Sequence, residues 1–194
     1  MLDEKNKKLI NFLQEDGRKS LNEIGKRQGM SHTSIQKRLN KLKSENLVNI
    51  SAVLNLSNLG YTFAIIIAEI EGHENLTNIM ERFKGCPRIL FLSPMMGGHN
   101  IIAIMACEDP SSLNQILNVC SFRNDPAVRR SEVYLCDNPI LPEFFNFPIC
   151  LDSEKESSPC GINCKICQKF IDAKCVGCPA SKYYKFDFSK NKRK

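Results

Sequence analysis

Five cysteines crowd into residues 160–178 and carry the most distinctive chemistry in this sequence. They are Cys160, Cys164, Cys167, Cys175 and Cys178, spaced C-x3-C-x2-C-x7-C-x2-C. Cysteine thiolates are soft ligands that bind zinc and iron-sulfur clusters. So many thiols without a metal would be open to oxidation, so the spacing predicts a metal-binding site.

Two kinds of metal centre fit these cysteines. Zinc prefers four tetrahedral thiolates, which the pairs Cys164/Cys167 and Cys175/Cys178 could supply, leaving Cys160 spare. An iron-sulfur cluster of the 4Fe-4S type also takes four thiolates, and the crowding of these cysteines is similar to that of ferredoxin ligands. We favour the iron-sulfur cluster over zinc and leave open which four of the five cysteines bind it.

An enzymatic function is not expected. The C-x3-C-x2-C spacing that begins at Cys160 also occurs in radical-SAM enzymes, but only 27 residues follow Cys167, too few for a catalytic barrel. The sequence also shows no paired acid and base and no nucleophile arrangement.

The charges divide the chain into basic, acidic and basic parts. Residues 1–60 carry 11 Lys and Arg against 6 Asp and Glu, residues 61–149 carry 6 against 10, and residues 150–194 carry 10 against 5. This division suits two parts that approach a polyanion and a middle part that contacts protein or a small ligand.

The first third of the chain predicts a helix-turn-helix. A helix with an apolar stripe stops at Asp16-Gly17, and a capping box at Ser20–Glu23 opens a second helix over Leu21–Gln28. Gly29-Met30 makes a turn before a third helix from His32 to about Glu45. The alternation of apolar residues after Leu47 predicts a small hairpin, which would be a wing.

The third helix would read double-stranded DNA in the major groove. The residues that we expect to face the DNA are Ser31, His32, Thr33, Gln36, Lys37, Arg38 and Lys41. The first five lie on the outward N-terminal face, whereas Arg38 and Lys41 lie nearer the phosphates. A non-DNA three-helix module with a basic surface is the alternative.

Residues Leu2–Tyr61 resemble the DNA-binding domain of the Lrp/AsnC (feast/famine) regulators. The stretch LDEKNKKLINFLQEDGRKSLNEIGKRQGMSHTSIQKRLNKLKSENLV has the order of that family. It contains an opening Leu-Asp, an Asp-Gly-Arg turn, a Met-Ser before the recognition helix and an Asn-Leu-Val exit. The resemblance implies a sequence-specific transcription regulator.

Residues 61–149 predict a βαββαβ order. The expected strands are 61–70, 88–95, 100–107 and 127–135, and the expected helices are 75–84 and 111–119. The two middle strands are almost wholly apolar, which predicts a sheet covered by helices on one face and by a second subunit on the other. We therefore expect a homodimer, with a higher homo-oligomer as a possible extension.

This middle part resembles the ligand-binding domain of the same family, which implies a ferredoxin-like fold and an effector loop. The loop would be Gly97, Gly98, His99 and Asn100, where the family usually has Gly-x-x-Asp. Asn100 removes a carboxylate that could pair with the ammonium group of an amino acid. A tight turn that only links two strands is the alternative.

The expected fold class is α+β, in three parts. Residues 1–60 form a winged helix-turn-helix, residues 61–150 a ferredoxin-like sensing and dimerisation domain, and residues 151–194 a linker and a cysteine-rich metal module. For Cys86, Cys107, Cys120 and Cys136 we expect core packing. The N-terminus is no signal peptide and no apolar run is long enough for a membrane helix, so we expect a cytoplasmic protein without a membrane partner.

The sequence thus predicts a DNA-binding regulator whose cysteine cluster senses redox state, oxygen, iron or sulfur. The alternative is the same regulator with a structural zinc or protein-docking tail, in which the central domain senses a small, amino-acid-like effector.

Overall fold

The computed structural model describes residues 2–148 and 153–187. Its chain divides into two compact units, Met1–Ala52 and Val53–Lys194, which are described one after the other. We expected boundaries after residues 60 and 150; the second of these lies outside the described residues.

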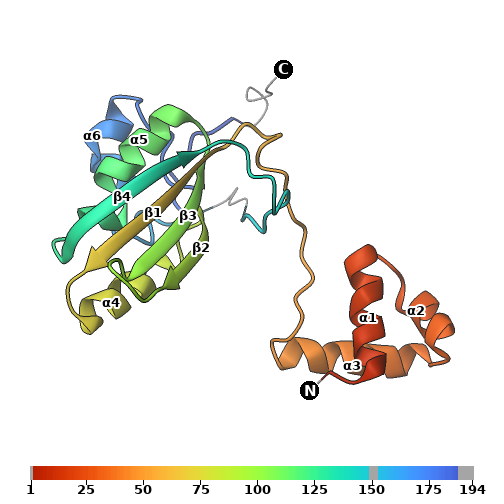
Figure 1. The fold of residues 1–194 in the computed structure, drawn as a ribbon. Coiled ribbons are helices and arrows are strands. Elements are labelled where there is room, and N and C mark those ends of the chain that lie inside the picture. Colours follow the sequence, from red (N-terminus) through yellow and green to blue (C-terminus); the bar gives the residue numbers. More distant parts are fainter. Residues whose placement is uncertain (1, 149–152, 188–194) are drawn as a thin grey trace. The chain divides into compact units, whose positions relative to one another are not determined.

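Three helices form the first unit: α1 (Glu4–Glu15), α2 (Leu21–Gln28) and α3 (His32–Ser44) (Figure 1). Each begins at a side-chain cap, with Asp3, Ser20 and Ser31 accepting from the backbone of the first turn. Gly29 ends α2 in the left-handed region at φ 63°, which a glycine adopts without strain. The three predicted helices are therefore confirmed.

The core of this unit consists of one apolar residue from each of α1 and α2 and three from α3. These residues are Leu9, Ile24, Ile35, Leu39 and Leu42. A Cβ on Gly25 would lie 2.6 Å from the carbonyl oxygen of Met30, so the turn between α2 and α3 needs glycine at this position.

The predicted wing is wrong. Residues 48–53 contain no strand, and Leu54 instead pairs with Phe145 in the second unit. Their two backbone hydrogen bonds measure 2.8 and 2.9 Å. Alternation of apolar residues indicates extended chain but does not identify its partner, and the sequence between Leu47 and Leu54 has no glycine that would fold a tight hairpin.

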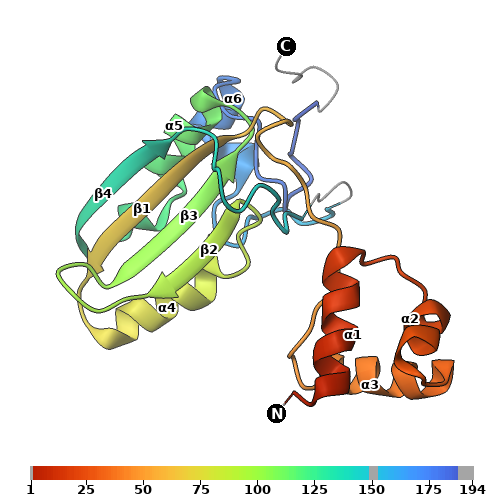
Figure 2. The ribbon, with the colours of Figure 1, turned by 45° about the vertical axis from the view of Figure 1, so that its right-hand side comes forward.

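The second unit contains a four-stranded antiparallel sheet in the order β2-β3-β1-β4 (Figures 1 and 2). Its strands are β1 (Thr62–Ile70), β2 (Ile89–Pro94), β3 (Ile101–Cys107) and β4 (Val128–Cys136), and its helices are α4 (His73–Phe83) and α5 (Pro110–Val119). The βαββαβ order is confirmed, and this sheet order is that of a ferredoxin-like fold.

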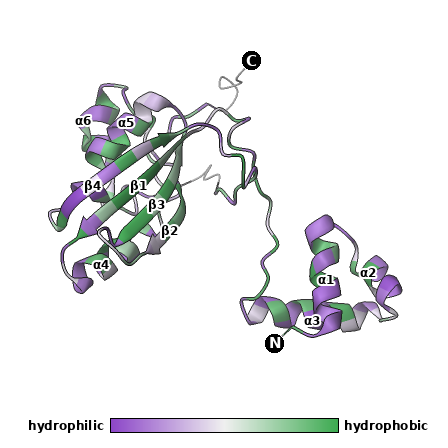
Figure 3. Cartoon of the chain, viewed as in Figure 1, coloured by the Kyte–Doolittle hydropathy of each residue, from purple (hydrophilic) through white to green (hydrophobic). Residues whose placement is uncertain are grey.

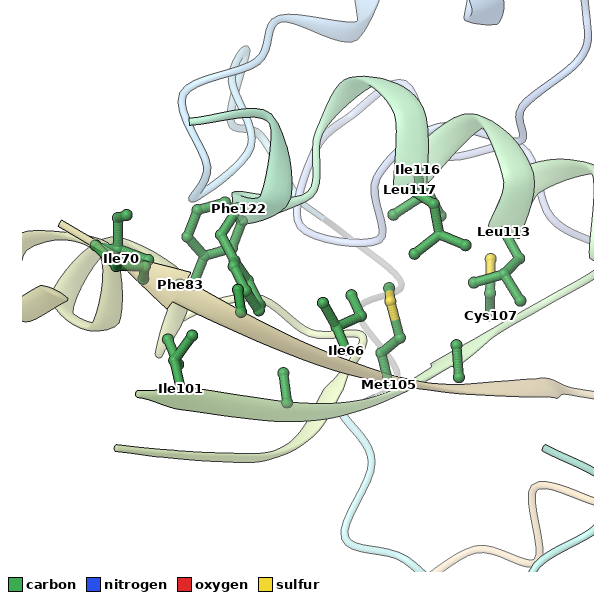
Figure 4. Packing of buried hydrophobic residues seen from close by; sticks show 14 of the residues in the cluster. Ile66, Ile70, Phe83, Ile101, Met105, Cys107, Leu113, Ile116, Leu117 and Phe122 are labelled. Atoms are coloured by element: carbon green, nitrogen blue, oxygen red, sulfur yellow. The ribbon is translucent and has the colours of Figure 1, made fainter. Parts of the chain in front are cut away.

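Helices α4 and α5 cover one face of the sheet. Side chains such as Ile66 and Met105 point from the strands towards Phe83, Leu113 and Ile116 (Figure 4). Figure 3 shows that β3 is hydrophobic over most of its length, as a strand in the middle of a covered sheet must be.

The cysteine-rich tail packs in the same compact unit as the sheet. It contains the short helices η2 (Cys164–Ile166) and α6 (Gln168–Ile171), and α6 lies beside α5 in Figures 1 and 2. The backbone N–H of Val176 donates to Ser112 Oγ of α5 at 3.2 Å. The segment that we expected to be a linker runs to Pro159, but its Ser158 is only 6% exposed, so the end of this segment is part of the packed structure.

Within the described ranges, no helix is both long and apolar enough to cross a membrane.

Candidate functional site

All five tail cysteines line one cavity of about 50 Å³. Two further cysteines, Cys86 and Cys120, line the same cavity, together with Arg88 and the apolar side chains of Ile116, Val119 and Phe170. We call this space the thiol cavity. It brings together the five cysteines that the sequence singled out and adds two from the sheet domain.

The thiols of the cavity are close to one another without forming a ready-made metal site. In the part of the chain that the structure describes, no three His, Cys, Asp or Glu side chains are arranged to hold a metal ion. Burial raises the pKa of Cys175 and of Cys178, so their thiols keep their protons more firmly than exposed ones. A metal would have to displace these protons and draw the sulfurs together.

Cys86 and Cys120 line the thiol cavity, although sequence reasoning assigned them only to the core. Both do pack against the core, and burial raises the pKa of Cys86 to about 11. However, Cys86 follows the end of α4 and Cys120 caps the end of α5, so both lie where helices on the same face of the sheet end. Each of these two helices is followed by a cysteine, and this pattern is the sequence signal that could have indicated that Cys86 and Cys120 lie at one cavity. Cys107 is a buried core residue, as expected.

Cys120 and Cys160 form a hydrogen-bonded pair of thiols at one side of the thiol cavity. The hydrogen bond from Cys120 lowers the pKa of Cys160 to about 6, and the same bond raises the pKa of Cys120. Cys160 thus pairs with a cysteine of the sheet domain, and it is also close enough to Cys178 for their charges to interact.

A buried ion pair borders the thiol cavity. Arg88 donates to both carboxylate oxygens of Glu108, at 2.9 and 3.0 Å, and these residues are 4% and 0% exposed. Arg88 also donates to the carbonyl oxygen of Gly177 at 2.5 Å, and the hydroxyl of Tyr184 donates to Glu108 at 2.8 Å. The pair thus joins the sheet to two points of the tail.

Arg88 gives the thiol cavity a permanent positive charge. Burial disfavours this charge, but the carboxylate of Glu108 outweighs burial and holds the pKa of Arg88 well above its usual value. Because Arg88 lines the cavity, its guanidinium favours thiolates or a negatively charged thiolate-bound group there.

The recognition helix α3 presents part of the expected DNA-binding set to solvent. Ser31 is the N-cap, with its Oγ accepting from the backbone of Ser34 at 3.2 Å. His32, Thr33 and Lys37 are exposed. These positions leave the N-terminal end of α3 accessible, as groove entry requires.

Three other members of that set have partners within the first unit. Gln36 donates to Asn40 at 2.8 Å, and Lys41 lies 3.7 Å from Glu45. Arg38 donates to Asp3 at 2.7 Å and holds α3 to the start of α1. Sequence reasoning missed this contact because Asp3 is distant in the chain and has no periodic relation to α3.

The loop expected to bind an effector is held by the sheet. The side chain of Asn100 accepts from the backbone N–H of Ile70 at 2.8 Å and donates to its carbonyl at 2.7 Å. Arg130 donates to the carbonyl of Gly98 at 2.6 Å, and His99 lies 3.5 Å from Glu132. Gly97 adopts φ 139°. The side chain of Asn100 therefore extends the hydrogen bonding between β1 and β3. This role supports the interpretation of residues 97–100 as a turn that links two strands.

A helix-turn-helix unit joined in one chain to a βαββαβ sheet unit defines a class of DNA-binding regulators. Residues 2–43 match the family model of the AsnC-type helix-turn-helix domain. This match covers α1, α2 and nearly all of α3, so the first unit is similar to an AsnC-type DNA-binding domain.

Two similar proteins come from Pyrococcus horikoshii. The HTH-type transcriptional regulator LrpA is 28% identical over 119 residues, which cover 61% of this chain and 84% of LrpA. The HTH-type transcriptional regulator FL11 is 26% identical over 120 residues, covering 61% of this chain and 79% of FL11.

Solved structures share the fold. Escherichia coli AsnC has a TM-score of 0.64 at 17% identity and covers 73% of this chain and 96% of its own. The leucine response regulatory protein LrpA of Mycobacterium tuberculosis has a TM-score of 0.64 at 21% identity and covers 76% of this chain and 100% of its own.

Proposed function

We propose that this protein is a sequence-specific, Lrp/AsnC-type transcription regulator that carries a thiolate-bound metal centre in the thiol cavity. The observation that carries this proposal is the convergence of seven cysteines on one cavity in the unit that follows the helix-turn-helix. Signal reception would lie in the second unit and DNA reading in the first.

DNA recognition falls to α3. Thr33 and Gln36, near its N-terminus, would meet base edges, and Lys37 and Lys41 would supply salt-dependent affinity for phosphates. The relatives LrpA and FL11 are named as transcriptional regulators, which supports the same role here.

The open face of the sheet supports a homodimer. Tyr134, Ile65, Ile104 and Phe91 form one register row across all four strands, on the face opposite α4 and α5. Tyr134 is 52% and Phe91 49% exposed. A row of large apolar side chains on an uncovered sheet face is typical of a surface that a second subunit buries.

The proposed metal centre is an iron-sulfur cluster. The residues that would hold it are Cys164, Cys167, Cys175 and Cys178, since Cys160 pairs with Cys120. Such a cluster supplies one-electron redox chemistry and sensitivity to oxygen. The apolar walls of the cavity limit water access, and the guanidinium of Arg88, which is also paired with Glu108, lies at its border.

Zinc is the second candidate because the cavity is small. A volume of about 50 Å³ has room for only a few waters, since roughly 10–15 Å³ of such space holds one. A single ion needs less room than a cluster. Zinc would make the tail a structural module, and sensing would then fall to the central domain.

The test begins with full-length protein purified without oxygen. Iron, acid-labile sulfide and broad visible absorbance support the cluster, whereas one colourless zinc per chain supports the second candidate. Absence of any bound metal contradicts both. DNA affinity is then measured with the centre intact, oxidised and removed, and equal affinity in all three states would rule out a sensing role.

A further inference from the structure

The Cys120–Cys160 pair lies between two pockets. One is the thiol cavity. The other is an open surface pocket of about 210 Å³, which we call the outer pocket; its lining includes Arg82, Phe83 and Asp125. Among the residues that the structure describes, Cys120 and Cys160 are the only cysteines that line the outer pocket, and both also line the thiol cavity. A small molecule in the outer pocket would therefore meet these two sulfurs first.

The two sulfurs come from separate segments that the fold holds together. Cys120 caps the C-terminal end of α5, and Cys160 follows the buried Ser158 in the tail. Both pack against the main core, and both are only partly buried. Packing limits their movement apart, while partial exposure leaves them accessible to a reagent.

We propose that Cys120 and Cys160 are a redox-active dithiol that a low-molecular-weight disulfide oxidises from the outer pocket. The Cys160 thiolate attacks one sulfur of the reagent, whose S–S bond breaks and whose other half leaves and takes up a proton. Cys120, after giving its proton to water, attacks the Cys160 sulfur of this mixed disulfide and releases the second half as a thiol. One disulfide forms, one breaks, and two electrons pass to the reagent.

This dithiol goes beyond the proposed metal centre and does not need it. It consists of Cys160, which is not among the four proposed metal ligands, and Cys120 of the sheet domain. The resulting disulfide would join the tail covalently to the end of α5.

The experiment uses the full chain, purified without oxygen and incubated with mixtures of oxidised and reduced glutathione. Free thiols are then alkylated and the protein is digested with trypsin for mass spectrometry. The expected product joins peptide 89–123 to peptide 156–165, with fragmentation placing the bond between Cys120 and Cys160. Cys120→Ser should instead leave Cys160 carrying one glutathione, because the second attack is lost.

Cys136→Ser is the matched control, since Cys136 lies on β4 and lines neither pocket. It should form the same link as the unsubstituted protein. A link from Cys160 to Cys164, or Cys160 that stays glutathionylated although Cys120 is present, would overturn the proposal.

Metal content separates this inference from the proposed function. Cys160→Ser should keep the metal per chain of the unsubstituted protein, whereas Cys164→Ser should lose it. Loss of metal in Cys160→Ser makes Cys160 a ligand and overturns the dithiol. A Cys120–Cys160 link in a protein that binds no metal would overturn the metal centre alone.

Discussion

At the scale of single residues, the junction between sheet and tail depends on a few contacts that sequence spacing does not reveal. Arg88 and Glu108 form a bidentate ion pair where the sheet contacts the tail, and the carbonyl oxygen of Gly177 accepts from the same guanidinium. Charged groups are rarely this buried unless all their polar atoms have partners. These residues therefore hold the tail in place whether or not a metal is bound.

Arg88→Met should lower the free energy of unfolding by about 3–5 kcal/mol, because the carboxylate of Glu108 would stay buried without its cation. Urea unfolding of the full chain measures this change. Arg88→Met combined with Glu108→Leu should recover most of the loss, since both charges are then absent. A double variant as unstable as the single one would contradict this explanation.

Gly177→Ala should loosen the tail more than Gly161→Ala. Both glycines have nearly the same backbone conformation, at φ 86° and 87°. A Cβ at Gly177 would lie 2.6 Å from the carbonyl oxygen of Tyr183, whereas a Cβ at Gly161 meets nothing within 4 Å. Gly161→Ala should therefore cost only the ~1–2 kcal/mol of a left-handed alanine. Alkylation rates of the tail cysteines provide the readout, and equal rates in both variants would count against the clash.

At the scale of elements, local signals in the sequence predicted most helices and strands. They did not predict the contacts between segments that are distant in the sequence. Ser20 and Ser31 identify the starts of α2 and α3, and apolar runs identify β1 and β3. The wing failed because extended chain after Leu47 pairs with Phe145, far along the sequence. For the same reason the five tail cysteines could be grouped from spacing, but Cys86 and Cys120 could not.

Within α3, Lys41→Ala and Gln36→Ala should weaken DNA binding in different ways. Lys41→Ala should reduce affinity for all sequences and lower the salt dependence of the logarithm of affinity by about 1, as expected for one phosphate contact. Gln36→Ala should reduce affinity for a selected site more than for random DNA, because glutamine reads base edges. Titrations at several salt concentrations distinguish the two, and the same salt slope in Lys41→Ala as in the parent would exclude a phosphate contact.

At the scale of the whole molecule, the sheet unit has one face covered by its own helices and tail. The other face is covered at one end, where Phe63 packs against Phe145, and is open around Tyr134 and Phe91. The covered face contains the thiol cavity, and the open face contains the apolar row of Tyr134 and Phe91. Signal reception and subunit contact would thus lie on opposite faces of the same four strands. The four strands would therefore be one route by which a change at the cavity reaches the open face.

Phe91→Glu should convert the proposed dimer to a monomer, because it places a charge in the apolar row that a second subunit would bury. Light scattering coupled to size-exclusion chromatography measures the mass. Ile140→Glu is the matched control, since Ile140 is 94% exposed and lies outside the strands. Dissociation by both variants alike, or by neither, would contradict an interface on the open face.

The buried ion pair also matters for the order in which the chain is made. Arg88 and Glu108 leave the ribosome before Gly177 and Tyr184, their partners in the tail. Until the tail arrives, the guanidinium and the carboxylate lack two of their hydrogen bonds, and the nascent sheet domain is incomplete. A segment that is synthesised after the sheet domain therefore completes the interior of that domain.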